Sequence, residues 1–436
     1  MTVQRKAQQV ELELIAKSAP PVTLGMSATA LARVEDHLKR RYIDSGRFPG
    51  TQTLIYRRGA IAHSAVQGYA DLERKKPMQD DTIFRIYSMT KPITSVAFMM
   101  LVEEGRVALD EPVHKYIPQW QDLRVFQAGT TPPFLTRPVT RPMQIVDLLR
   151  HTSGLTYGFQ QRSNVDAAYR AKKIGEVEKA GTMQSMIDDL ASIPLEFSPG
   201  EAWNYSVSTD VIGYLIEKIS GQPFEQFLRE RIFQPLGMHD TDFHVPAAKA
   251  HRFAACYNAT PGGMATFHSP GAKGGLTLQD DPTTSSFLEP PSFISGGGGL
   301  CSTAADYLTF CRALLNRGEL GGVRLLAPKT LALMTTNHLP GGKDLTQLSR
   351  SLFSEATYAG IGFGLGFSIS IDPALSLIPG SPGEYAWGGA ATTSFWIDPA
   401  EDLIAIFMTQ VLPSSAYPVR RELRTLVYSA ITDSNL

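Results

Sequence analysis

The chain of 436 residues is 43% hydrophobic and 19% charged, with a formal net charge of -1. This balance is typical of a globular protein and gives no electrostatic basis for binding nucleic acid or an anionic membrane surface. Its three cysteines argue against a disulfide framework, and no cysteine–histidine cluster has the spacing of a metal site. The longest apolar run, residues 96–102, is too short to cross a bilayer, so we expect a soluble cytoplasmic protein.

The first predicted elements are a helix and a hairpin. Ser27 can cap a helix that runs to about residue 45, with its apolar residues on one face. Two strand patterns follow, residues 52–57 and 60–69. Arg58 and Gly59 between them are typical of a tight hairpin turn.

The next predicted helix carries Ser88 and Lys91. Pro92 fits only in a first helical turn, so this helix begins near Ser88, and an apolar stripe covers residues 96–101. Residues three apart lie on the same helix face, which brings the Lys91 amine to the Ser88 hydroxyl. A serine becomes a nucleophile when a base takes its proton, and burial lowers the pKa of a lysine toward that task. Ser-x-x-Lys is a common string, and the alternative is that Ser88 is an ordinary helix cap.

The middle of the chain is mostly helical, with two loop-like stretches. Residues 127–142 hold four prolines, and residues 258–299 are rich in Gly, Pro, Ser and Thr. Toward the other end, residues 393–398 and 402–409 form a second predicted hairpin, followed by an amphipathic helix over 419–431. Hairpins and helices at both ends predict one antiparallel sheet flanked by the terminal helices, with a helical region inserted between them.

Further strings appear in a fixed order along the chain. They are residues 88–91, 148–155, 197–200 leading into 205–207, 297–303 and 387–389. Together they resemble the serine β-lactamase and penicillin-binding protein superfamily, and most closely its esterase branch. That branch, the family VIII carboxylesterases, is similar to class C β-lactamases. The resemblance covers about residues 50–399, most of the chain.

The resemblance implies an α+β fold with the site in a cleft. The sheet domain is expected at residues 20–87 and 295–436, and the mostly helical domain at 88–294. In such a fold Tyr205 faces Ser88 and Lys91, shares the serine proton with the lysine and later protonates the leaving alcohol. The alternative is that Tyr205 is an ordinary core tyrosine. His151 lies within one of these strings and Asp306 closely follows another, and we interpret both as structural.

The resemblance also implies the groups that surround the substrate. The backbone N–H of Ala390 joins that of Ser88 in an oxyanion hole. Trp387, Gly388, Gly389 and Val207 contact the substrate, and the glycines allow a close approach of the backbone. Trp387 stands where β-lactamases carry a lysine that meets the substrate carboxylate, and Val207 where they carry an asparagine. Both differences disfavour β-lactam hydrolysis and leave ester hydrolysis intact.

The predicted protein is therefore a serine carboxylesterase. It hydrolyses small, short-chain esters through an acyl-enzyme on Ser88, without a metal or organic cofactor, and retains weak β-lactamase activity. We expect short chains because the segments 127–142 and 258–299 would crowd the cleft. The partner is a small-molecule ester, with no nucleic acid or membrane, and the oligomeric state does not follow from the sequence. The alternatives are an acyltransferase of the lovastatin-synthesis type, a β-lactamase or D-amino-acid peptidase and, last, a non-catalytic binding protein.

Overall fold

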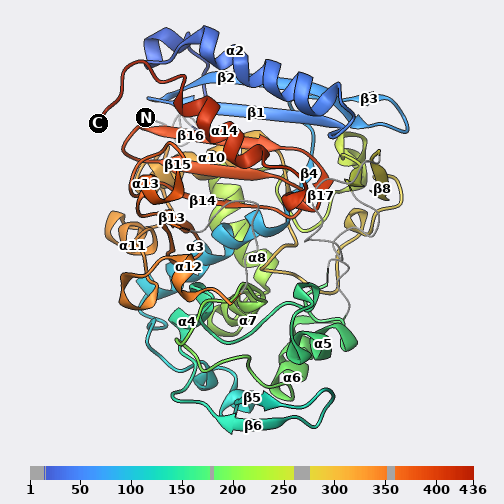
Figure 1. Ribbon diagram of the computed structural model, residues 1–436, viewed down its shortest axis with the longest axis vertical. Coiled ribbons are helices and arrows are strands. Elements are labelled where there is room, and N and C mark those ends of the chain that lie inside the picture. Colours follow the sequence, from blue (N-terminus) through green and yellow to red (C-terminus); the bar gives the residue numbers. More distant parts are fainter. Residues whose placement is uncertain (1–13, 15, 177–180, 260–274, 351–358) are drawn as a thin grey trace, which may run out of the picture.

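The computed structural model describes residues 14, 16–176, 181–259, 275–350 and 359–436. Within these residues the largest element is an eight-stranded antiparallel sheet (Figure 1). Its strand order is β12-β13-β14-β15-β16-β1-β2-β3. The strands are β1 (Gly50–Arg57), β2 (Ala60–Asp71), β3 (Lys76–Pro77), β12 (Ile361–Phe363), β13 (Ser368–Ser370), β14 (Tyr385–Gly388), β15 (Ser394–Asp398) and β16 (Leu403–Met408).

The centre of the sheet joins the two ends of the chain. Strand β1 pairs antiparallel with β16, so that Leu54 faces Ile406 across the ladder. Successive side chains of a strand point to opposite faces, and both faces of these strands are covered. Ile55 packs with the terminal helices α2 (Ala28–Leu38) and α14 (Val419–Tyr428), whereas Leu54 belongs to the large cluster on the other face. Figure 1 shows α2 and α14 crossing the sheet.

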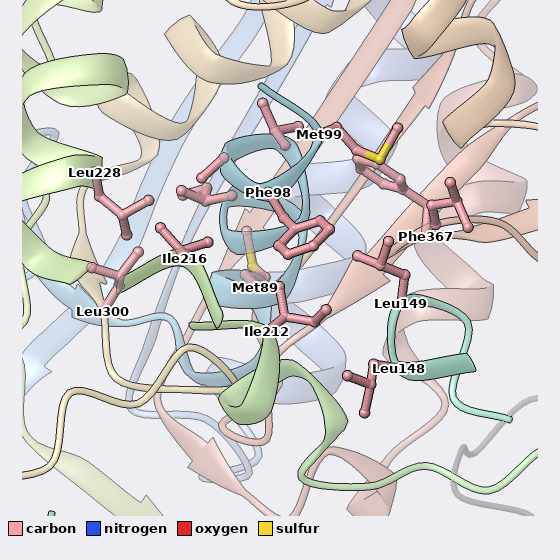
Figure 2. Packing of buried hydrophobic residues seen from close by; sticks show 14 of the residues in the cluster. Met89, Phe98, Met99, Leu148, Leu149, Ile212, Ile216, Leu228, Leu300 and Phe367 are labelled. Carbon is pink, nitrogen blue, oxygen red and sulfur yellow. The ribbon is translucent and has the colours of Figure 1, made fainter. Parts of the chain in front are cut away.

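The helix that follows Ser88, α3 (Thr90–Glu103), lies at the centre of the large cluster. Every residue from Thr90 to Leu101 is buried, including Thr94 and Ser95. The residues of the expected apolar stripe are therefore buried, and the polar residues beside them are buried as well, because α3 packs between the sheet and other helices. Figure 2 shows Phe98 of α3 in this cluster, with Ile212 of α7 (Ser208–Ser220) and Leu149 of α4 (Ile145–Leu149).

The remaining elements surround this core. The helices are α5 (Asn164–Ala171), α6 (Met183–Ala191), α8 (Phe224–Leu228), α9 (Gln234–Leu236), α10 (Ala304–Leu315), α11 (Pro328–Met334), α12 (Leu345–Leu348) and α13 (Pro373–Ser376). The short strands are β4 (Phe84–Arg85) with β9 (Cys301–Ser302), β5 (Arg124–Ala128) with β6 (Leu135–Pro138), β10 (Glu319–Leu320) with β11 (Val323–Arg324), and β7 (Cys256–Asn258) between β8 (Thr277–Asp280) and β17 (Val411–Leu412).

The α+β fold class is confirmed, and so are both hairpins. Ser27 caps α2 by accepting a hydrogen bond from the N–H of Ala30 at 3.2 Å, and Arg58 and Gly59 take the positive φ angles, 48° and 89°, of a tight turn. Helix α14 ends at Tyr428, three residues before the expected end. The division at residues 88 and 294 stays a prediction. Within the described ranges, no helix is long and apolar enough to span a membrane.

One expected loop proved wrong. The prolines of residues 127–142 predict a loop, but part of this stretch pairs as the hairpin β5–β6, drawn at the far end of the molecule from the sheet in Figure 1. Pro138 is tolerated because it takes the last position of β6, where it pairs with Arg124. In the second expected loop, 258–299, strand β8 is present, and residues 260–274 lie outside the described part of the chain.

Candidate active site

Ser88 lies in a short 3-10 turn, Tyr87–Met89, that leads from β4 into α3. Tyr87 has a φ of 43°, a conformation that bulky side chains rarely adopt and that the surrounding structure must hold in place. The turn is fixed from two sides: Tyr307 donates to the Met89 carbonyl at 2.9 Å, and the Leu300 N–H donates to Thr90 Oγ1 at 3.1 Å. The Ser88 hydroxyl is therefore presented by a rigid segment.

The Ser88 hydroxyl contacts both predicted partners. Tyr205 Oη donates a hydrogen bond to Ser88 Oγ at 2.6 Å, and Lys91 Nζ lies 3.2 Å from the same oxygen. Tyr205 comes from the loop that precedes α7, far from Ser88 in the sequence. The structure thus brings together Ser88, Lys91 and Tyr205, all three named from the sequence.

The Lys91 side chain is 1% exposed and has further oxygen partners. Its Nζ donates to the Gly297 carbonyl at 2.6 Å and to Tyr157 Oη at 3.0 Å. The backbone at Gly297 is in turn held by the buried Asp210, whose Oδ1 accepts from the Gly297 N–H at 3.0 Å. Lys91 is oriented by groups from three separate segments of the chain.

Tyr157 was not among the residues predicted from the sequence. It follows the string at residues 148–155 by two positions, which is the one signal that could have drawn attention to it. Its ring stacks on Phe159 with centroids 4.7 Å apart, and burial raises the pKa of its phenol well above the ordinary value. Tyr157 is therefore a neutral phenol at the Lys91 amine.

Tyr205 is also a buried phenol. Burial raises the pKa of Tyr205, and the hydrogen bond with Ser88 only partly offsets that effect, so the resting side chain is protonated. The His151 ring lies 5.1 Å from that of Tyr205, and its Nδ1 is 3.2 Å from Ser206 Oγ. Burial and the nearby Lys91 hold the pKa of His151 well below its usual range, so His151 is a neutral packing partner.

A cavity of about 140 Å³ begins at Ser88. Trp387 forms part of its wall and packs against Phe363 and Tyr205, with ring centroids 5.3 and 5.5 Å away. Leu345 and Ile361 add apolar surface. Serines and the charged Glu384, Arg420 and Arg424 also line it, so the cavity combines apolar surface with polar groups, as is typical of a site for a small organic molecule.

The other predicted substrate contacts divide into two groups. Gly388, Gly389 and Ala390 line the cavity together with Trp387 and Ser88. Val207 does not, because its side chain has no exposed surface and is covered from the side of Gly175, where a Cβ atom would come within 2.8 Å of it. The structure therefore places Val207 in the core behind the site.

The two glycines make room for protein groups. A Cβ atom at Gly388 would lie 2.6 Å from the guanidinium carbon of Arg420, and one at Gly389 would lie 2.4 Å from the Ile86 carbonyl oxygen. The expectation from the sequence was that these glycines let the backbone approach the substrate. Contacts within the protein therefore require a small residue at Gly389, where the neighbour is backbone, and favour one at Gly388, where a side chain would displace Arg420.

The crowding expected from the two loop-like stretches is not found. Among the described residues, neither 127–142 nor 258–299 contributes to the lining of the cavity. The lining comes from Ser88 and from residues after 344, in α12, in β12 to β15 with the segments that connect them, and in the stretch from Ser414 into α14. The basis for expecting short substrates must therefore be the size of the cavity itself.

The sequence pattern of the Beta-lactamase family matches residues 31–429. The chain belongs to this family. Among curated members, it is 31% identical to Esterase EstB of Burkholderia gladioli over 95% of this chain and all of that one. It is 36% identical to Protein Rv1367c of Mycobacterium tuberculosis H37Rv over 86% of this chain and 88% of the other.

Solved structures agree with this membership of the Beta-lactamase family. EstCE1, described as a hydrolase with promiscuous acyltransferase activity, superposes with a TM-score of 0.74 at 26% identity. The match covers 93% of this chain and 99% of EstCE1. The resemblance to the esterase branch, drawn from short strings, is thereby confirmed.

Proposed function

We propose that this protein is a serine carboxylesterase that hydrolyses small, short-chain esters through an acyl-enzyme on Ser88. The observation that carries the proposal is the position of the Ser88 hydroxyl, 2.6 Å from the Tyr205 phenol and 3.2 Å from the Lys91 amine. A nucleophile within hydrogen-bond reach of a base is the arrangement that acyl transfer requires. The similarity to Esterase EstB and EstCE1 supports esters as the substrate class.

Acylation begins when Ser88 Oγ attacks the ester carbonyl carbon. The serine proton passes to the Lys91 amine, while the Tyr205 phenol gives its proton to the departing alkoxide, which leaves as the alcohol. The products on the enzyme are an acylated Ser88, a Lys91 ammonium and a Tyr205 phenolate. The ammonium stabilises the phenolate, because Lys91 Nζ lies 4.6 Å from the centre of the Tyr205 ring.

Deacylation reverses the proton transfers. The Tyr205 phenolate takes a proton from a water molecule, and the hydroxide attacks the acyl carbon. When the bond to Ser88 breaks, the serine oxygen takes back a proton from Lys91, and the carboxylic acid leaves. Both steps pass through an oxyanion, which the backbone N–H groups of Ser88 and Ala390 stabilise.

The cavity supports a small substrate. Its volume of about 140 Å³ is close to that of a cavity that holds a benzene-sized molecule, about 150 Å³. Trp387 provides a flat apolar wall beside Ser88, where it contacts the uncharged part of an ester. We propose no contact between Val207 and the substrate, since its side chain is fully buried.

A second candidate activity is acyl transfer to an alcohol. The observation that favours acyl transfer is the similarity to EstCE1, which is described as a hydrolase with promiscuous acyltransferase activity. The chemistry differs only in deacylation, where an alcohol replaces water and the product is a new ester. Adding an alcohol to the assay would then shift the product from the acid to the ester.

The test is a series of p-nitrophenyl esters from acetate to dodecanoate, together with an organophosphonate that labels activated serines. We expect the highest kcat/KM between acetate and about hexanoate, the range that a cavity of benzene-like volume admits. The label should map to Ser88 and disappear in Ser88→Ala, while Ser414→Ala, on another part of the cavity wall, should keep it. A label that persists in Ser88→Ala, or a maximum at dodecanoate, would contradict the proposal.

A further inference from the structure

We infer that Arg420 is a positioning residue of the oxyanion hole, holding the peptide that carries the Ala390 N–H. The inference rests on the proposed function, because it assigns a role within the same acyl-transfer reaction. Arg420 lies in the first turn of α14, on the cavity wall. No sequence pattern pointed to it.

The guanidinium of Arg420 clamps the turn between β14 and β15. Its Nη2 donates to the Gly389 carbonyl at 2.7 Å and to the Thr393 carbonyl at 3.0 Å. The same turn is closed by backbone bonds, from the Gly389 N–H to the Thr393 carbonyl at 2.8 Å and from the Thr392 N–H to the Gly389 carbonyl at 3.1 Å. Arg420 thus bridges the two ends of the turn that contains Ala390.

The geometry of the peptide bond links this clamp to the oxyanion. The Gly389 carbonyl and the Ala390 N–H belong to one planar trans peptide, so they point in opposite directions. Fixing the carbonyl oxygen on Arg420 therefore fixes the direction of the N–H. A charge-assisted bond to the carbonyl also polarises the peptide and makes its N–H a stronger donor.

The packing around the Arg420 guanidinium restricts the residues beside it. A Cβ atom at Gly388 would lie 2.6 Å from both the guanidinium carbon and Nη2 of Arg420, so a larger residue there would displace the guanidinium. On its other side, the turn contacts the segment that leads to the nucleophile: Ala390 packs with the cluster that contains Tyr87. Arg420, the turn and the Ser88 segment consequently form one rigid unit around the proposed hole.

The experiment compares Arg420→Met with Arg420→Lys and with Arg421→Met as a matched control. Methionine keeps an unbranched apolar side chain but removes the charge and the donors, and lysine restores the charge without the planar fork. Arg421 is the exposed neighbour on α14, whose Nη2 bonds the Leu377 carbonyl at 3.3 Å. Each variant is assayed with p-nitrophenyl butyrate and with the matching thionoester, whose sulfur is a larger and weaker acceptor for the hole.

We expect kcat of Arg420→Met to fall about tenfold to a hundredfold, less than the roughly 10²–10³ lost when a donor itself is removed. KM should change by less than about twofold, since an interaction made in the transition state is lost. In Arg420→Met the preference for the ester over the thionoester should also shrink. Arg420→Lys should recover part of the lost kcat and part of the lost preference. Arg421→Met should match the wild type.

Three outcomes distinguish a failure of the role inferred for Arg420 from a failure of the proposed esterase function. A rise in KM at constant kcat would assign Arg420 to substrate binding and overturn the inference. An equal loss on ester and thionoester would show that Arg420 only maintains the fold, and overturn it as well. Absence of ester hydrolysis in the wild type would instead contradict the proposed function.

Discussion

The rings of Tyr157 and Tyr205 lie 5.2 Å apart between centroids, and the Lys91 amine contacts both. The two phenols differ in what they reach. Tyr205 Oη bonds the Ser88 hydroxyl, whereas Tyr157 Oη accepts from Lys91. Proton transfer and orientation of the lysine are therefore divided between two tyrosines.

Lys91 and Tyr205 should behave as one unit. Lys91→Ala and Tyr205→Phe should each lower kcat by about a hundredfold or more, the usual contribution of a positioned acid or base. The double variant should be little worse than either, because residues that act together give non-additive losses. Tyr214→Phe, which removes a phenol bonded to Gln184 on α6, is the control. Near-wild-type turnover in Tyr205→Phe would reduce Tyr205 to a core residue.

Tyr157→Phe should have a smaller effect. The variant removes one hydrogen-bond partner of Lys91 and leaves the contacts at Ser88 intact. Lys91 becomes an ammonium when it takes the serine proton, and a hydrogen bond to a charged group contributes about 1.5–3 kcal/mol, so kcat should fall about tenfold to a hundredfold. Steady-state kinetics and the rate of phosphonate labelling should decline together. A variant with unchanged rates would show that Tyr157 only fills space.

β-Lactams should be poor substrates, and Trp387 a principal reason. These substrates carry a carboxylate beside the reacting ring, and an indole has one N–H donor and no charge. A charge-assisted hydrogen bond is worth about 1.5–3 kcal/mol, so its absence costs about one to two decades in rate. On one preparation, kcat/KM for nitrocefin should lie below that for p-nitrophenyl butyrate.

The role of Trp387 can be tested by restoring the charge. Trp387→Lys should raise the ratio of nitrocefin to ester turnover above that of Trp387→Phe, which keeps an aromatic ring next to Phe363 and Tyr205. The ratio is the informative quantity, since both variants disturb that packing. Nitrocefin equal to the ester in the wild type would overturn the substrate assignment.

Asp306 should make stability depend on pH. Burial raises its pKa to about 6, although its carboxylate accepts from the Asp240 N–H and the Thr241 hydroxyl. The folded state then binds the proton more tightly than the unfolded state, so this stabilisation is present at low pH and lost as pH rises from about 4 through about 6. Relative to Asp306→Asn, the wild type should lose at most about 3 kcal/mol over that interval.

Urea unfolding at pH 4.5 and pH 7 measures this difference. Asp36→Asn, on an exposed part of α2, serves as the control and should follow the wild type at both values. A difference between wild type and Asp306→Asn that does not change with pH would show that Asp306 stays ionised.

The short sequence spacing between Ser88 and Lys91 made this part of the candidate active site predictable. Ser88 and Lys91 are three residues apart, so a single helical turn decides their contact, and the sequence places them correctly. Tyr205 could be named because a short string precedes it. Tyr157 and Arg420 reach the site through contacts between segments far apart in the chain, and such contacts leave no periodic signal.

The errors have a similar origin. The prolines of residues 127–142 predict a loop where part of the hairpin β5–β6 lies. Prolines argue against strands, and the end position that accommodates Pro138 is visible only in the paired structure. Helix α3 was expected to have one apolar face, but Thr94 and Ser95 are buried as well, with Thr94 Oγ1 donating to the Gly296 carbonyl at 2.8 Å. A buried hydroxyl with a partner on another segment cannot be distinguished by sequence from a solvated one.

The pairing of β1 with β16 determines when a newly made chain can fold. During synthesis, β1 leaves the ribosome long before β16. The ladder between them, in which Arg57 pairs with Leu403, therefore cannot form until β16 has been made. Until then the apolar face of β1 that α2 does not cover lacks its partners, and exposed apolar surface of this kind favours aggregation. The Arg420 clamp emerges later still. Hydrolytic activity should therefore arise only after β16 and α14 have been synthesised.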